Sequence, residues 1–204
     1  MRRFFCIICD APNFRPEHLC LFCESKVNAR PTPYFLRFER DVPHYYLFKW
    51  TPKTDGFCRR LAYFLKNRRS EDFLKWALMF SPQMAPVGIR QAFVPKCSSE
   101  KGVNHAKEFA LSLKKLLGFK CVLEVGAFLG PQKQRTRGER AEAFKRSVFK
   151  KRKVRKLDCS WVFVDDVFVT GGTYKRVGSE FKEAPEMIVT LFYRPLVGRD
   201  DDVL

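Results

Sequence analysis

The chain has 204 residues and is strongly basic, with 39 Lys and Arg against 22 Asp and Glu and a net charge of +17. Its 46% hydrophobic residues are enough to build a packed core, which excludes a wholly disordered chain. No apolar run is long enough for a membrane-spanning helix, and the first residues lack the pattern of a secretory signal. We therefore expect a cytoplasmic protein whose positive charge favours a polyanionic partner such as nucleic acid.

Two CxxC pairs lie near the N-terminus, Cys6/Cys9 and Cys20/Cys23. Each pair can turn two sulfurs toward one point, so two pairs supply the four thiolates of a tetrahedral Zn²⁺ site. A unit of about 30 residues lacks the core to fold without a metal or disulfides. The sequence therefore predicts a structural zinc module over residues 1–30, with a redox pair or coincidental core cysteines as alternatives. The four single cysteines are predicted to be buried in the core: Cys58, Cys97, Cys121 and Cys159.

The second predicted domain covers residues 31–204 and begins with a proline-containing linker. The hydrophobic pattern predicts strands over residues 45–50, 89–94, 121–125, 161–164 and 187–193, and the strand at 121–125 is expected to be buried. Cap and breaker residues predict helices from Thr54 or Asp55, from Ser70, from Asn104 to Gly118, and from Thr173. Because strands and helices alternate, we expect an α/β fold with a parallel sheet covered on both faces.

The most informative stretch runs from Trp161 to Thr173. An apolar strand leads into two carboxylates, Asp165 and Asp166, at the strand end where open parallel sheets bind ligands. The loop that follows can direct backbone amides and hydroxyls at a phosphate, and it consists of Val169, Thr170, Gly171, Gly172 and Thr173. Two carboxylates beside such a loop suit the vicinal hydroxyls of a ribose 5-phosphate. The alternative is an acidic loop with a glycine-rich turn that binds nothing.

A basic segment at residues 131–156 contains twelve Lys and Arg against two Glu, and so holds +10 of the net charge. Basic side chains that follow a backbone, with Phe144 and Phe149 for base stacking, are ingredients of single-stranded nucleic-acid binding. The alternative is a solvated loop. The candidates for nucleic-acid contact are Lys145, Arg146, Lys150, Lys151, Arg152, Lys153, Arg155 and Lys156.

The stretch from Asp165 to Thr173 resembles the 5-phosphoribosyl-1-diphosphate (PRPP) motif of the type I phosphoribosyltransferases. Together with the four-cysteine module, it makes the chain similar to the ComF family of competence-related proteins. Two further segments support the narrower resemblance. They are Val94-Pro95 followed by Lys101-Gly102-Val103-Asn104-His105-Ala106, and Gln132 followed by Glu139-Arg140 and Phe144.

The resemblance implies a type I phosphoribosyltransferase-like domain that binds PRPP, with Mg²⁺ held by the ligand. It implies that Asp165 and Asp166 contact or support the ribose and that Pro95 and Lys96 belong to a diphosphate-binding loop. The candidates for the anionic end of the substrate or for catalysis are Lys101 and Arg140.

The resemblance also implies a role in handling single-stranded DNA during natural transformation, with a DNA-uptake helicase or other competence proteins as partners.

The chain departs from the family pattern at Val169, where the family has the first Thr of a pair, and at Ala143, where it has Asn. Whether the protein is an enzyme is therefore left open. A catalytically active phosphoribosyltransferase in nucleobase or nucleotide metabolism is the alternative, and a zinc-dependent adaptor with a vestigial pocket is a third hypothesis.

Overall fold

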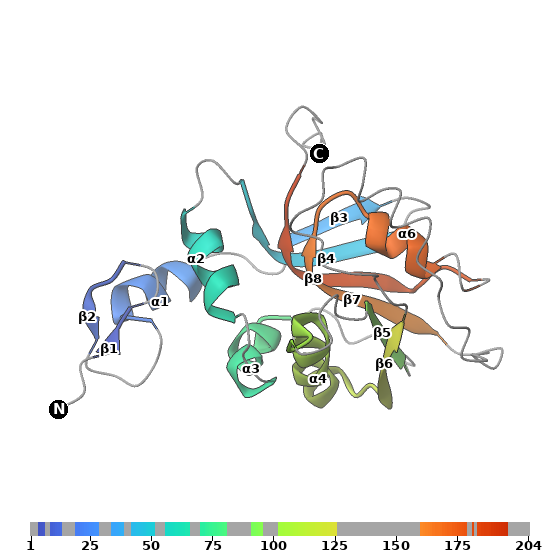
Figure 1. The fold of residues 1–204 in the computed structure, drawn as a ribbon, viewed down its shortest axis with the longest axis horizontal. Helices are drawn as coiled ribbons and strands as arrows, with labels where there is room; N and C mark the ends of the chain where they lie inside the picture. The colour runs from blue at the N-terminus through green and yellow to red at the C-terminus, as the bar shows by residue number, and fades with distance from the viewer. Residues whose placement is uncertain are drawn as a thin grey trace.

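The computed structural model describes residues 4–6, 9–13, 19–28, 34–38, 42–51, 56–65, 70–80, 91–95, 102–125, 160–178, 181 and 183–195. Among these residues, six strands form one sheet (Figure 1): β3 (Tyr34–Phe38), β4 (Val42–Lys49), β5 (Gln91–Pro95), β6 (Cys121–Val125), β7 (Trp161–Phe168) and β8 (Met187–Tyr193). Their order across the sheet is β3-β4-β8-β7-β5-β6. β3 pairs antiparallel with β4, and the other five strands are parallel. The predicted α/β class with a parallel sheet is therefore confirmed.

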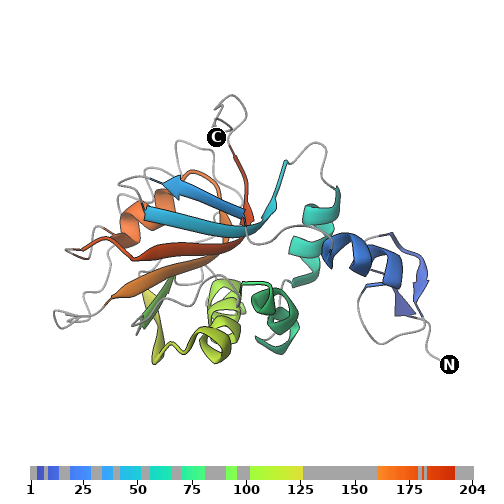
Figure 2. The ribbon, with the colours of Figure 1, turned by 180° about the vertical axis from the view of Figure 1, so that it is seen from behind.

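Helices cover both faces of this sheet (Figures 1 and 2): α2 (Gly56–Leu65), α3 (Ser70–Leu78) and α4 (His105–Leu117) pack on one side, and α6 (Gly172–Gly178) on the other. Along β7, Val162 and Val164 are buried with α2, α3 and α4, whereas Phe163 is buried with Tyr174 of α6. A strand buried on both faces needs a continuous apolar run, which is what residues 161–164 have. None of the helices within the described residues is long and apolar enough to cross a membrane.

The helix ends follow the local sequence. The Asn104 side chain caps α4 by accepting a hydrogen bond from the Lys107 N–H, and Gly118, with φ 72°, ends the helix in the left-handed region. The prediction of a helix from Asn104 to Gly118 is confirmed, because these two residue types satisfy the free groups at helix ends. α3 begins at Ser70, as predicted, and buries Phe73, Trp76 and Ala77.

β4 and β5 differ from the predicted ranges 45–50 and 89–94 in their ends, and three other strands differ more. β7 continues four residues beyond Val164, so Asp165 and Asp166 lie within the strand and not after it. The strand at residues 121–125 forms as predicted, but its predicted burial is wrong, because β6 is the last strand in the sheet order. Its Leu123 side chain is 38% exposed. The sequence did not predict β3, which forms by pairing with β4.

The N-terminal unit contains β1 (Phe4–Phe5), β2 (Pro12–Asn13) and α1 (Leu21–Asn28). Ion pairs of the described residues join it to the rest of the molecule: Asp10 Oδ2 lies 2.7 Å from Arg60 Nη1 of α2, and Glu24 pairs with Lys75 of α3. Cys6, Leu19 and Cys23 belong to the same buried cluster as the apolar sides of α2, α3 and α4. The unit therefore packs against the helices on this side of the sheet, beside α2 in Figure 1.

Candidate functional site

Four cysteines of the N-terminal unit come together as the CxxC spacing predicts. The sulfurs of Cys6, Cys9, Cys20 and Cys23 all lie within 4.8 Å of one another, and could hold a metal ion. The Cys9 and Cys20 sulfurs are 3.7 Å apart. Four sulfurs bound at about 2.3 Å to a tetrahedral ion are separated by roughly 3.8 Å. The spacing of the cluster therefore fits a bound metal ion.

Backbone hydrogen bonds shape the cysteine cluster. The Asp10 N–H donates to the Cys6 carbonyl and the Cys6 N–H donates to the Ala11 carbonyl, both at 2.9 Å, which closes a tight turn after β1. Asp10 takes φ 57° in this turn, a left-handed conformation that Asp tolerates better than most residues. Burial and the neighbouring thiols raise the pKa of Cys23. A bound cation opposes this effect, because metal ligation favours the thiolate form.

A second candidate site lies where the chain connections diverge across the sheet. β5 leads through α4 to β6 on one side, and β7 leads through α6 to β8 on the other, while β5 and β7 are neighbours. Open α/β sheets bind ligands outside the carboxyl ends of the strands at such a switch point. In this protein these ends are Pro95 of β5 and the segment from Asp165 to Phe168 of β7.

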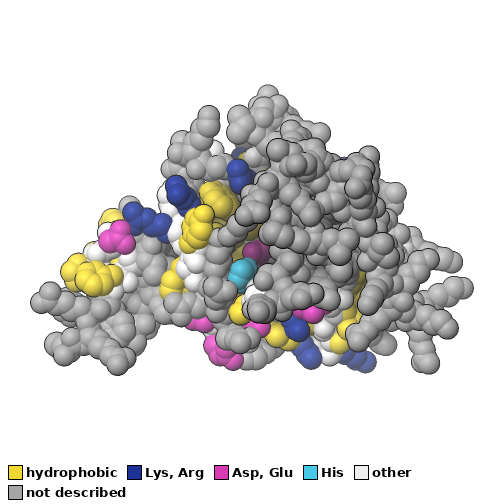
Figure 3. All heavy atoms as spheres, in the orientation of Figure 1, with side chains coloured by type: hydrophobic (Ala, Val, Ile, Leu, Met, Phe, Trp, Pro, Cys, Tyr) yellow, Lys and Arg dark blue, Asp and Glu magenta, His cyan; other side chains and the backbone are white. Residues whose placement is uncertain are grey.

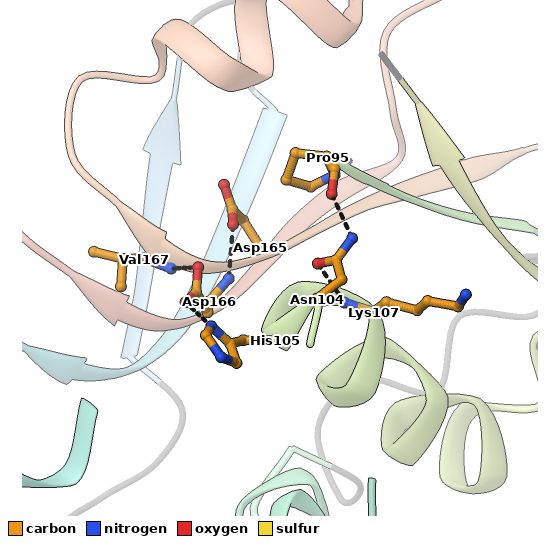
Figure 4. Close-up of polar contacts among 7 residues, drawn as sticks. All are labelled: Pro95, Asn104, His105, Lys107, Asp165, Asp166 and Val167. Atoms are coloured by element: carbon orange, nitrogen blue, oxygen red, sulfur yellow. Dashed lines mark hydrogen bonds and ion pairs between the residues drawn. The ribbon is translucent and has the colours of Figure 1, made fainter. Parts of the chain in front are cut away.

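The two aspartates of β7 point to opposite sides of the strand. Asp165 is 8% exposed and follows Phe163 on the face that α6 covers, whereas Asp166 faces α4. Asp165 Oδ1 accepts a hydrogen bond from the Asp166 N–H at 2.8 Å, and Asp166 Oδ1 accepts one from the Val167 N–H at 2.9 Å. Asp166 Oδ2 lies 3.7 Å from Nδ1 of His105, the first residue of α4 (Figure 4). The carboxyl groups therefore meet different surroundings.

These surroundings shift the pKa values of the two carboxyl groups in opposite directions. Burial raises the pKa of Asp165 well above its ordinary value, and the charge of Asp166 raises it further. Burial also opposes ionisation of Asp166, but His105 and the Val167 N–H hold the pKa of Asp166 below its ordinary value. Figure 3 shows histidine and acidic side chains side by side at the surface, in agreement with the partial exposure of His105 and Asp166. The pair thus combines a carboxyl group whose pKa is raised with one whose pKa is lowered.

The loop between β7 and α6 turns sharply at Gly171, where φ is 69°. The Lys175 N–H donates to the Gly171 carbonyl at 2.8 Å, which makes the first helical bond of α6. The Gly172 N–H lies 3.3 Å from Thr170 Oγ1. A side chain at residue 171 would be strained in this conformation. The glycine therefore allows the helix to begin directly after the strand, as the predicted phosphate-binding loop requires.

Sequence reasoning missed the role of Asn104 at this site and did not single out His105. Asn104 Nδ2 donates to the Pro95 carbonyl at 2.8 Å and to Glu124 Oε1 at 3.0 Å (Figure 4 shows the first bond). One side chain thus fastens the start of α4 to the ends of β5 and β6. The position of these two residues in the sequence could have indicated their role, because a helix that follows β5 must begin near the carboxyl ends of the strands.

Other predicted residues lie outside the described part of the chain. These are Lys96, Lys101 and Arg140, the single cysteines Cys97 and Cys159, and the basic candidates Lys145, Arg146, Lys150, Lys151, Arg152, Lys153, Arg155 and Lys156. Of the two single cysteines that are described, Cys58 is buried as predicted, whereas Cys121 on the edge strand is only partly buried.

Comparison of the chain with protein-family models and with curated proteins finds no match. The resemblance to ComF proteins is therefore a prediction that rests on the quoted sequence motifs. The geometry itself supports two features, a cysteine cluster with metal-site spacing and a carboxyl pair at the switch point of a parallel sheet.

Proposed function

We propose that the carboxyl end of β7 and the loop before α6 bind a ribose phosphate of the PRPP type. The observation that supports this most is the position of Asp165 and Asp166 at the switch point, followed directly by the turn at Gly171. In this proposal the ribose hydroxyls bind the two carboxyl groups, and the phosphate binds backbone amides between Thr170 and Thr173.

The chemistry of the carboxyl pair suits a diol. A carboxylate accepts hydrogen bonds from hydroxyl groups, which suits Asp166 with its lowered pKa. The raised pKa of Asp165 favours its protonated form, and a protonated carboxyl group both donates and accepts. Mg²⁺ bound to the ligand's diphosphate and hydroxyls would neutralise the phosphate charge. Transfer of the ribosyl group needs donors that stabilise the departing diphosphate, for which Lys101 and Arg140 are the candidates. If the protein is an active phosphoribosyltransferase, at least one nucleobase must release diphosphate from PRPP. A screen of nucleobases for diphosphate release tests whether the protein is such an enzyme.

For the cysteine cluster we propose Zn²⁺ as the metal and a structural role. Four cysteine ligands complete a tetrahedral site, so no position is left for a substrate or a reactive water. Metal analysis of the purified protein is expected to find one zinc ion per chain.

The experiment for the ribose-phosphate proposal is a calorimetric titration with PRPP and Mg²⁺. We compare the wild type with Gly171→Ala, which strains the loop, and with Gly178→Ala at the other end of α6, where an added Cβ has nothing within 4 Å. We expect Gly171→Ala to weaken binding at least about tenfold, because the loop amides move, while Gly178→Ala binds like the wild type. Absence of binding to the wild type, or equal affinities, would contradict the proposal.

A wider role in handling single-stranded DNA during natural transformation is supported by the net charge of +17. We expect the protein to bind a labelled oligonucleotide in fluorescence anisotropy. For about six contacted phosphates, log affinity should fall against log salt with a slope of roughly −4. Neutralising Lys150, Lys151 and Arg152 should weaken binding, whereas Asp165→Asn should not. Absence of binding at low salt would leave the ribose-phosphate site as the whole function proposed.

A further inference from the structure

An arginine and a tryptophan meet at the carboxyl edge of the sheet, close to the candidate site. Trp50 follows β4, and its backbone N–H donates to the Tyr193 carbonyl at 2.7 Å. Arg194 follows β8, and its backbone N–H donates to the Phe168 carbonyl at 2.8 Å. The guanidinium carbon of Arg194 lies over the Trp50 ring, 5.4 Å from its centroid. Backbone hydrogen bonds thus fix both residues beyond their strands, and a cation–π contact joins them.

The contact with Trp50 holds the charge of Arg194 but uses none of its hydrogen-bond donors. A guanidinium group carries five N–H donors. Within the part of the chain that the structure describes, the Arg194 side chain makes neither a hydrogen bond nor an ion pair. The residue is only partly exposed, and a partly buried cation without an anionic partner is costly. Arg194 therefore offers a fixed positive charge with its donors available for an anion.

Tryptophan is a costly residue at position 50 unless it serves the arginine. Its Nε1 atom is buried and has no hydrogen-bond partner among the described residues. Its ring packs 6.0 Å from that of Phe192, between centroids, a contact that a phenylalanine would also make. A phenylalanine would avoid the unpaired N–H, but tryptophan attracts a cation more strongly than any other aromatic residue. The choice of residue therefore favours a role in holding Arg194.

The pair lies on the same face of the sheet as Asp166. Trp50 packs against the buried cluster under α2, α3 and α4, and Asp166 faces α4. Arg194 follows Tyr193, whose partner Phe168 lies two residues after Asp166. With about 3.3 Å per residue and about 4.8 Å between strands, the Cα atoms of Arg194 and Asp166 are roughly 11 Å apart. This separation leaves room for a small ring between the two side chains.

The sheet order indicates which part of a ligand would meet Arg194. In the proposed function the ribose binds Asp165 and Asp166, the loop amides bind its phosphate, and the diphosphate is directed toward Pro95 at the end of β5. β5 and β8 lie on opposite sides of β7. The side of β8 is therefore left for a group other than the phosphates, and the proposed function provides for one, a nucleobase ring.

We propose that Trp50 and Arg194 form a subsite for the carboxylate group of a heteroaromatic ring, which binds beside the ribose phosphate. The planar guanidinium group matches a carboxylate with two parallel hydrogen bonds, and the ring fills the space between Arg194 and Asp166. The position beside a ribose phosphate rests on the proposed function, whereas binding of the carboxylate can be measured without PRPP.

The test uses two pairs of compounds that differ in the carboxylate: nicotinate with nicotinamide, and orotate with uracil. ¹H–¹⁵N NMR follows the indole N–H groups of the three Trp residues, and Trp50→Phe identifies the Trp50 signal. Trp76 and Trp161 are each 4% exposed and serve as internal references. We expect nicotinate or orotate to shift the Trp50 signal saturably, and its neutral partner and inorganic phosphate to bind at least about tenfold more weakly.

Variants of equal charge change identify the residue responsible. Arg194→Gln should weaken carboxylate binding at least about tenfold, and Arg194→Lys should weaken it less, because it keeps the charge but loses the forked geometry. Lys120→Gln is the control and should bind like the wild type, since Lys120 is exposed and precedes β6 at the opposite edge of the sheet.

Three results would overturn the proposal: equal affinities for the carboxylates and their neutral partners, equal effects of Arg194→Gln and Lys120→Gln, or inorganic phosphate bound at Trp50 as tightly as the carboxylates. Absence of binding by both carboxylates would overturn it as well, even where PRPP binds. Failure of PRPP to bind the wild type would instead contradict the proposed function, and the carboxylate titration would still decide the role of Arg194.

Discussion

The two faces of the central sheet are built from the same strands but differ in what they bury. The face under α2, α3 and α4 buries apolar strand residues, and its buried polar residue among those described, Ser112, lies on a helix and donates to backbone carbonyls. The face under α6 buries aromatic residues together with Asp165, Thr190 and His44. Burial of polar groups is costly unless they are paired. The first face is therefore a mainly apolar core, whereas the second face carries buried polar groups, Asp165 of the candidate site among them.

The largest expected effect comes from the cysteine cluster, because Cys6 and Cys23 belong to the buried cluster of the first face. Structural zinc sites contribute about 10 kcal/mol or more to folding in zinc-finger peptides. Cys6→Ser or chelation should therefore lower the thermal midpoint strongly and release the metal, as calorimetry and metal analysis can measure. Cys121→Ser on the edge strand β6 is the control and should keep the metal. Equal midpoints for the two variants would show that the cluster does not support this face.

Truncation within the first face is expected to cost stability without affecting the site. Phe109 of α4 is fully buried and its ring contacts those of Phe73 and Phe80. Phe109→Ala should cost about 3–5 kcal/mol in urea denaturation, because it leaves a cavity. Leu78→Ala is the control, since Leu78 is 51% exposed, and it should cost below about 0.5 kcal/mol. A folded Phe109→Ala protein with strongly weakened PRPP binding would break the division between the faces.

On the second face, replacement of the ionisable Asp165 side chain by a neutral one is expected to increase stability. Because the pKa of Asp165 is raised in the folded state, the folded protein holds a proton that the unfolded chain loses above pH 3.8. The stability from this group is thus complete below pH 3.8 and is lost as the pH rises through the folded pKa. Asp165→Asn, which cannot ionise in either state, should gain on the order of 1 kcal/mol at pH 7. Thermal midpoints at pH 7 and pH 3.5 measure this. A lower midpoint for the variant at pH 7 would contradict it.

The smallest effect is expected at the ion pair between the N-terminal unit and α2. The Asp10 and Arg60 side chains are 74% and 49% exposed, so water and salt screen their attraction. Asp10→Asn should change the free energy of unfolding by less than about 1 kcal/mol and leave the metal bound. A larger loss in urea denaturation would mean that this contact, and not the shared apolar cluster, holds the unit in place.

Local signals explain what the sequence could predict. The prediction for β8, Met187–Tyr193, matches the structure at both ends because its apolar run is continuous, and α4 was bounded by Asn104 and Gly118. The end of β7 was not predicted correctly, because Asp is uncommon in strands. Pairing with β8 extends this strand to Phe168. The exposure of β6 depends on its place in the sheet order, which the local pattern does not encode.

The residues of the candidate sites likewise fall into those that the sequence predicted and those that it did not. The cysteines, the aspartates and the glycine loop are close in sequence, so their spacing alone suggested their chemistry. The partners that orient these groups come from distant segments. Asp166 meets His105, which begins a helix after another strand. Such contacts depend on how the strands are ordered, and no local pattern records that order.

The most direct test of a ribose-phosphate site at the end of β7 is an NMR titration of the ¹⁵N-labelled protein with PRPP and Mg²⁺. The account predicts that the largest amide shifts occur from Asp165 to Thr173 and at His105, where the switch point brings β7 and α4 together. It also predicts that the cysteine cluster shifts little, because that site has no place for a ligand. Saturable shifts confined to other parts of the molecule, or no shifts at millimolar ligand, would contradict it.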